Sequence, residues 1–90
     1  MFFEWDLRKA AANLKKHGVS FEEAMTVFLD DHSLTGADPD HSVGESRWLI
    51  IGRSTRGRML VVAHADDGGI IRLINARAAT RREKYLYEEG

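Results

Sequence analysis

Residues 47–76 read RWLIIGRSTRGRMLVVAHADDGGIIRLINA, three apolar runs separated by two short polar segments. The runs Arg47–Ser54, Arg58–Ala65 and Ile70–Ala76 have the aliphatic and aromatic content of strands. The segments between them, residues 54–57 and 66–69, contain the Gly, Asp and Ser residues that are typical of tight turns. The pattern predicts an antiparallel meander of three strands.

The residues before this stretch predict a short strand followed by two helices. Phe2-Phe3-Glu4-Trp5 has the aromatic content of a strand, and Asp6 can cap a helix over Leu7–Lys16 that ends at Gly18. Its apolar positions Leu7, Ala10, Ala11 and Leu14 are expected to face inward. Ser20 and Glu23 have the spacing of a capping box and predict a second helix over Phe21–Leu29. Residues 30–44 are polar and predict a loop.

After the meander, Thr80 and Glu83 repeat the capping-box spacing and predict a C-terminal helix. The expected fold is therefore α+β, an antiparallel sheet made of the three-strand meander plus a short N-terminal strand. The helices are expected on one face, in the order β-α-α-β-β-β-α. With 90 residues, the chain is expected to form a single domain spanning residues 1–90.

Composition excludes several classes of protein. The chain is 43% hydrophobic and 30% charged, which is typical of a globular protein and not of a disordered one. It has no cysteine, which excludes disulfides, zinc ribbons, iron–sulfur clusters and a cysteine nucleophile. The N-terminus lacks the apolar region of a signal peptide, and no apolar run is long enough to span a membrane. The expected location is the cytoplasm.

The net charge of −1 conceals a strong segregation of charge along the chain. Residues 19–45 contain seven acids and no Lys or Arg, whereas residues 46–84 contain nine Lys or Arg and three acids. Residues 1–18 carry a further net charge of +2. Because guanidinium groups stay charged and donate in a planar fork, the basic segments suggest contact with phosphate groups of a polyanion.

Along the predicted strand Arg58–Ala65, alternate side chains point to opposite faces of the sheet. Met59, Val61, Ala63 and Ala65 form an apolar face that is expected to pack on the helices, which leaves Arg58 and His64 on the open face. Arg77 ends the last predicted strand, which begins at Ile70, and Arg81 and Arg82 begin the helix after it. These arginines are therefore expected to gather at one end of the sheet.

If the polyanion is RNA, cleavage without a metal is chemically possible. The 2′-OH of RNA can attack its own adjacent phosphate, so the protein needs only a proton acceptor, a proton donor and fixed positive charge. The candidate proton carriers are His17, His64, Glu45 and Tyr85, and the candidate charge stabilisers are Arg58, Arg77 and Arg82.

Structural interpretations of the same residues remain open. Surface arginines are often solvated or paired with carboxylates, His17 can serve as a cation at a helix C-terminus, and His64 can be a partly buried sheet residue. The loop sequence Asp38-Pro39-Asp40-His41 matches no closed set of metal ligands, so we expect no metal and no cofactor.

Two groups of motifs resemble a known family over nearly the whole chain. The first comprises Phe3-Glu4-Trp5-Asp6, Lys9, the run from Asn13 to Ala24 with its Lys-His-Gly-Val-Ser-Phe-Glu-Glu-Ala segment, and Val27-Phe28. The second comprises Glu45, Arg47, Ile51-Gly52, Ser54, Gly57-Arg58, Ile71-Arg72, Ile74, Ala76-Arg77, Ala79-Thr80, Glu83 and Tyr85. Together they resemble the BrnT family, ribonuclease toxins of bacterial type II toxin–antitoxin pairs. At one strand position Asn75 stands where a Ser is expected.

The resemblance implies a RelE-like fold, metal-independent endonucleolytic cleavage of RNA, and arrest of translation and growth. It implies neutralisation by a BrnA-like antitoxin, which dimerises through a ribbon-helix-helix domain and binds the promoter of the operon. DNA would then be contacted only through the antitoxin, and no membrane is involved. Under this hypothesis Arg58, Arg77 and His17 are expected to be catalytic. The residues expected to contact RNA are Lys16, Arg53, His64, Arg81, Arg82 and Tyr85. The alternative is a non-catalytic interaction module, or an inactive toxin that acts with its partner as a co-repressor.

Overall fold

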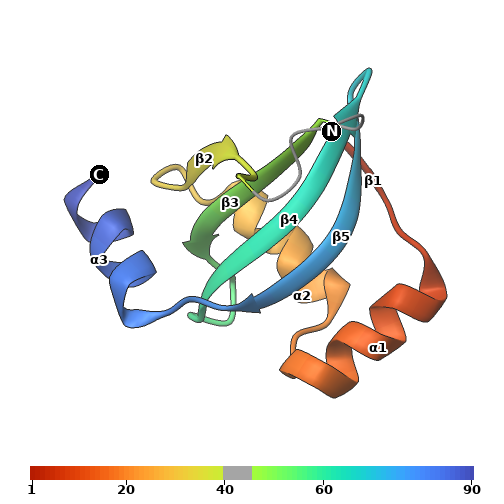
Figure 1. Ribbon diagram of the computed structural model, residues 1–90, viewed down its shortest axis with the longest axis horizontal. Helices are drawn as coiled ribbons and strands as arrows, with labels where there is room; N and C mark the ends of the chain where they lie inside the picture. The colour runs from red at the N-terminus through yellow and green to blue at the C-terminus, as the bar shows by residue number, and fades with distance from the viewer. Residues whose placement is uncertain (40–45) are drawn as a thin grey trace.

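The computed structural model describes residues 1–39 and 46–90 and contains one five-stranded sheet (Figure 1). The elements in chain order are β1 (Phe2–Glu4), α1 (Leu7–His17), α2 (Phe21–Thr26), the 3₁₀ turn η1 (Val27–Leu29), β2 (Leu34–Ala37), β3 (Arg47–Arg53), β4 (Met59–Asp67), β5 (Ile70–Ala78) and α3 (Arg81–Glu89). The strand order is β1-β5-β4-β3-β2, with β1 parallel to β5 and all other pairs antiparallel. The α+β class, the meander and the predicted order of elements are confirmed, with β2 as an additional strand. The expectation that the N-terminal strand joins an antiparallel sheet is wrong, because β1 runs parallel to β5.

The capping residues predicted for the helices begin them as expected. The side chain of Asp6 accepts hydrogen bonds from the backbone N–H of Arg8 and Lys9, and Gly18 ends α1 at φ 69°. Thr80 and Glu83 form a complete capping box at α3. At α2 the box is only half formed, because Ser20 accepts from the N–H of Glu23 while the Glu23 carboxylate bonds to other partners.

The strand β2 was not predicted, because Leu34–Ala37 lies within the stretch that the sequence indicates as a loop. Among the described residues its one pairing partner is β3, from Leu34 opposite Ile51 to Ala37 opposite Trp48, and it is largely exposed. A four-residue edge strand that contains Gly36 has neither the length nor the apolar alternation that identifies a strand. Residues 40–44 of the predicted loop lie outside the described residues.

The prediction of which face of β4 packs on the helices is wrong. Leu60, Val62 and His64 point toward α1 and α2, in a core formed with Phe21 and Leu73. Met59 and Val61 point to the other face, where they pack with Tyr87 of α3. Both faces of β4 are apolar, so the prediction depended only on the assumption that the polar Arg58 and His64 face solvent. Both side chains lie instead on the face of the sheet that packs on α1 and α2.

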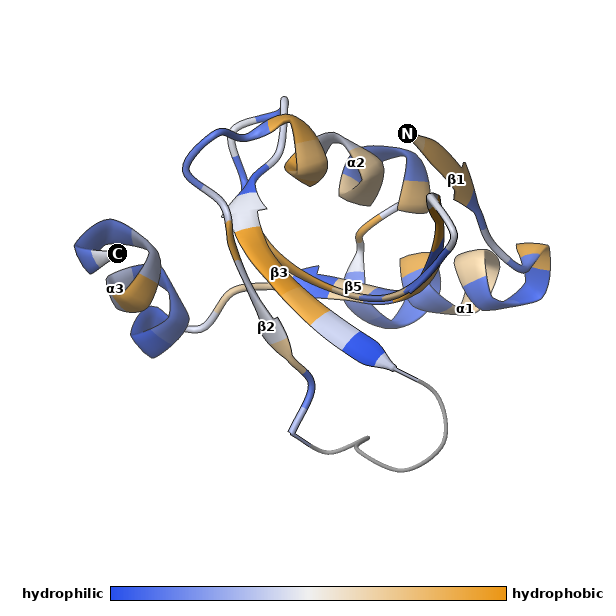
Figure 2. Cartoon of the chain, turned by 90° about the horizontal axis from the view of Figure 1, so that it is seen from above, coloured by the Kyte–Doolittle hydropathy of each residue, from blue (hydrophilic) through white to orange (hydrophobic). Residues whose placement is uncertain are grey.

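The expectation that all helices share one face holds for α1 and α2 and fails for α3. Figure 2 shows α3 on the opposite side of β3 from α1 and α2. The hydroxyl of Tyr87 donates to Oδ2 of Asp30 at 2.7 Å, which ties α3 to the end of η1. The face of α1 that packs inward also differs from expectation, because Leu7 and Leu14 are exposed and Asn13 is buried.

Asn13 joins α1 to β5 where the sheet lacks a neighbouring strand. Its Nδ2 donates to the carbonyls of Val19 and Ala76 at 2.9 and 2.8 Å, and its Oδ1 accepts from the N–H of Ala76 at 3.0 Å. Since β1 pairs with β5 only as far as Arg72, the amide of Asn13 takes the place of a strand partner for Ala76.

Replacing Asn13 by alanine is expected to lower the free energy of unfolding by about 3 kcal/mol, because three buried backbone groups lose their partner. Urea denaturation followed by circular dichroism measures this change. Lys15→Ala, an exposed position on the same helix, is the matched control and should change stability by less than about 0.5 kcal/mol. Equal stabilities of the two variants would contradict the assigned role of Asn13.

No helix in the described part of the chain combines the length and apolar character needed for a membrane span.

Candidate functional site

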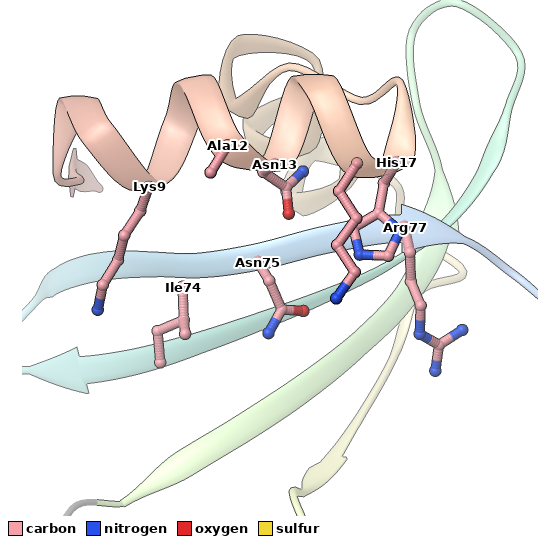
Figure 3. Close-up of a pocket in the computed structure, with 8 residues that line it drawn as sticks. Lys9, Ala12, Asn13, His17, Ile74, Asn75 and Arg77 are labelled. Carbon is pink, nitrogen blue, oxygen red and sulfur yellow. The ribbon is translucent and has the colours of Figure 1, made fainter.

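A groove of about 430 Å³ runs between α1 and the free edge of β5 (Figure 3). We call it the α1–β5 groove, and the residues that line it are Lys9, Ala12, Asn13, Lys16, His17, Ile74, Asn75 and Arg77. It brings together three of the residues predicted from the sequence: Lys16, His17 and Arg77. In Figure 3, Lys9 and Arg77 stand at opposite ends of the groove, with Asn75 between them.

The groove exists because β1 is short. After Glu4 the chain leaves the sheet and enters α1, so the second half of β5 borders a helix in place of a strand. On α1, Lys9, Asn13, Lys16 and His17 have the spacing i, i+4, i+7 and i+8 and therefore share the face turned toward β5. This spacing is the signal in the sequence that identifies Lys9 as a further member of the site.

An irregularity in β5 determines which side chains the strand contributes. Ala63 pairs with Asn75 whereas His64 pairs with Leu73, so Ile74 is an extra residue in the β5 strand. The shift places Arg72, Asn75 and Arg77 on one face, although simple alternation separates Arg72 from the other two. The sequence shows no signal for this bulge.

The groove is basic, and its charges are of two kinds. Within the described residues, the structure shows no ion pair or hydrogen bond for the side chains of Lys9, Lys16 and His17. Arg77 instead donates two hydrogen bonds to the Glu83 carboxylate, at 2.7 and 2.9 Å. These bonds lower the pKa of Glu83 to about 2 and raise that of Arg77. Lys9 and Lys16 are therefore available to an anion, whereas Arg77 is held in place at one end of the groove.

Arg58, predicted to be catalytic, lies outside the groove lining and is engaged with Glu23 of α2. Its Nε donates to Oε2 of Glu23 at 2.9 Å, and its Nη2 bonds to Oε1 of Glu23 and to the carbonyl of Gly18 at 3.0 Å. Ser54 donates to the same carboxylate at 2.7 Å. These hydrogen bonds, led by those from Arg58, lower the pKa of Glu23 despite its burial. The expectation that Arg58 faces the open side of the sheet is wrong.

His64, predicted to contact RNA, is 5% exposed, so the expectation that it faces the open side is also wrong. Its ring packs edge-on against Phe28, with 4.9 Å between the ring centroids. Burial lowers the pKa of His64, because the charged imidazolium is poorly solvated there. A neutral, buried imidazole has no surface to offer a ligand.

The remaining predicted residues lie around α3 and the end of β3. Arg81, Arg82 and Tyr85 are exposed on α3, and the guanidinium of Arg53 donates to the carbonyl of Gly57 at 3.2 Å. These residues do not line the α1–β5 groove. Glu45, Asp40 and His41 lie outside the described residues. Within residues 1–39 and 46–90, no three His, Cys, Asp or Glu side chains are grouped so that they could hold a metal ion.

Comparison with known proteins identifies what the chain is similar to. Residues 5–83 match the family model described as the ribonuclease toxin, BrnT, of type II toxin–antitoxin systems. The crystal structure of the Brucella abortus ribonuclease toxin BrnT superposes with a TM-score of 0.67 and 23% sequence identity, covering 90% of this chain and 100% of that chain. No curated protein sequence matches.

Proposed function

The chain belongs to the BrnT family of ribonuclease toxins of type II toxin–antitoxin systems, and from this premise we propose that it is a metal-independent endoribonuclease that binds RNA in the α1–β5 groove. The observation that carries the proposal is the convergence of Lys16, His17 and Arg77 on that groove. Lys16, for which the described residues offer no acidic partner, can contact a phosphate, and Arg77 adds a positive charge that Glu83 holds in place. The imidazole of His17 lies in the same lining.

In the proposed reaction the 2′-oxygen of RNA bonds to the adjacent phosphorus while the bond from phosphorus to the 5′-oxygen breaks. The 2′-OH gives up a proton and the departing 5′-oxygen gains one, which leaves a 2′,3′-cyclic phosphate and a 5′-OH. His17 is the proposed proton carrier, because imidazole can bind and release protons near neutral pH. Lys16 and Arg77 are the proposed stabilisers of the charge that develops on the phosphate oxygens.

Membership of a type II family implies a protein antitoxin as the partner. We propose that this partner is a small, dimeric ribbon-helix-helix protein that binds its own promoter, and that cleavage of RNA in the cytoplasm arrests translation and growth. An acidic segment of the antitoxin would compete with RNA for the basic groove, since opposite charge favours that docking.

The purified protein is expected to cleave RNA in the presence of EDTA and to leave 2′,3′-cyclic phosphate and 5′-OH ends. Lys16→Ala should cleave about tenfold more slowly because one phosphate contact is lost, whereas Lys15→Ala, a neighbour outside the groove lining, should cleave at the wild-type rate. Gel electrophoresis of a labelled RNA, with mapping of the new ends, measures both. Loss of cleavage in EDTA would contradict metal independence.

If the wild-type chain leaves RNA intact and its expression without the antitoxin is harmless, the protein is a non-catalytic module.

A further inference from the structure

In the α1–β5 groove, the side chain of Asn75 presents a neutral amide that can both donate and accept hydrogen bonds. It is exposed, and no hydrogen bond to it is found within residues 1–39 and 46–90. Asn13, the other amide of the groove, is buried and fully bonded to backbone groups. In Figure 3 the side chain of Asn75 extends from β5 on the side away from α1, between Lys9 and Arg77.

The bulge at Ile74 explains why the side chain of Asn75 is exposed. Because Ile74 is the extra residue, Asn75 follows it onto the face of the sheet that α1 and α2 leave uncovered. Its partner across the ladder is Ala63, whose methyl group is too small to cover the amide. Half-buried Ile74 lines the groove beside Asn75 and offers an apolar surface.

Cations flank the amide on both sides. Lys9 and Lys16 are seven residues apart on α1, which places their Cα atoms about 10 Å apart along the helix axis. Two phosphates that contact these lysines would belong to the same short stretch of strand, and the nucleotide between them would lie over β5. Its base would then reach Ile74 and Asn75.

We propose that Asn75 is a specificity-determining residue that selects adenine at one position of the RNA bound in the α1–β5 groove. The inference rests on the proposed function. A carboxamide presents a donor beside an acceptor, and adenine presents the matching pair, N6–H₂ with N1 or with N7, on two of its edges. Guanine, cytosine and uracil each present such a pair on the Watson–Crick edge alone, because the N7 edge of guanine has only acceptors and the pyrimidines have no N7. Adenine is therefore the base that a carboxamide can match on either edge. The base lies against Ile74, and Lys9 and Lys16 bind the flanking phosphates irrespective of sequence.

The test measures binding of fluorescent 2′-O-methyl oligoadenylate, oligocytidylate and oligouridylate of equal length by anisotropy, at one fixed salt concentration. A methyl group on the 2′-oxygen removes the nucleophile, so binding is observed without cleavage. The wild-type chain is expected to prefer oligoadenylate about tenfold. Asn75→Ala should lose that preference and keep its affinity for the other two oligonucleotides, because the exposed side chain supports no packing. Lys9→Ala is the control and should weaken binding to all three about equally.

Mapping the cleavage sites in a mixed-sequence RNA supplies the second measurement. Sites cut by the wild type should share an adenine at a fixed offset, and Asn75→Ala should cut at sites without that adenine. Wild-type binding and cleavage without any adenine preference would overturn this inference and leave the proposed function standing. The inference would also be overturned by an adenine preference that survives in Asn75→Ala. Failure of the wild type to bind any of the three RNAs or to cleave would overturn both.

Discussion

Replacing His17 by alanine is expected to lower the rate of RNA cleavage about 100- to 10,000-fold, the usual contribution of a positioned proton carrier. His17 is the last residue of α1 and lines the groove together with Lys16 and Arg77. It is exposed and forms no hydrogen bond within the described residues, so its removal should leave the fold intact. Single-turnover kinetics with a labelled RNA measure the rate of the chemical step.

The pH profile separates a proton carrier from a binding residue. If His17 moves a proton, its alanine variant should lose one limb of the wild-type profile, whereas loss of a binding contact should raise KM and leave the shape unchanged. His32→Ala is the matched control, because this histidine is also exposed on the surface and does not line the groove. A His17→Ala rate within threefold of wild type would remove His17 from the mechanism.

Replacing Arg58 by alanine is expected to lower the free energy of unfolding by about 2–3 kcal/mol at pH 7. The Glu23 carboxylate is 3% exposed and would lose its hydrogen bonds to the guanidinium while remaining buried. The side chain of Arg58 is 42% exposed, and water that enters its place would offset part of the cost. The contact from Arg58 to the carbonyl of Gly18, which fixes the end of α1, would also be lost.

The pH dependence of the free energy of unfolding tests whether the pairing of Arg58 with Glu23 causes this loss of stability. The pKa of Glu23 is lowered in the folded protein, chiefly by Arg58, so the pair stabilises the fold fully above the ordinary carboxyl pKa of 4.5 and loses that effect as the pH falls below it. The stability difference between wild type and Arg58→Ala should therefore narrow below pH 4.5 in urea titrations.

Arg56→Ala is the control for Arg58→Ala, because this guanidinium is 74% exposed and 3.7 Å from Glu23. Its loss should cost less than about 1 kcal/mol. Wild-type stability of Arg58→Ala would contradict the structural role. If the expected loss of stability is found, a lower rate of RNA cleavage by Arg58→Ala is not evidence that Arg58 is catalytic, and His17→Ala is the sharper probe of the site.

Much of the fold could be predicted from local patterns. The meander follows from three apolar runs separated by turns, and Asp6, Ser20 and Thr80 cap helices as their spacing indicates. These signals are local, since each depends on residues within a few positions of one another. The strand β2 was missed because it is stabilised by pairing with β3 and not by its own sequence.

The candidate site was predictable in part. The Lys, His and Arg residues that suit a phosphate are visible in the sequence, and Lys16, His17 and Arg77 do converge. The sequence does not show which arginines are paired with a carboxylate away from the groove, because Glu23 lies 35 positions from Arg58. The burial of His64 depends likewise on Phe28, a residue of another element.

Neighbouring residues specify every element except β2, the order of those elements and the supply of cationic side chains, because periodicity, capping and charge are local properties. Tertiary contacts decide which face of β4 the helices α1 and α2 cover, which arginines are paired with an acid, and where β5 has a free edge. Those outcomes depend on strand register, on the bulge at Ile74 and on contacts between residues distant in the chain. Such long-range pairings set burial and local charge, and therefore determine which basic residues can meet a ligand.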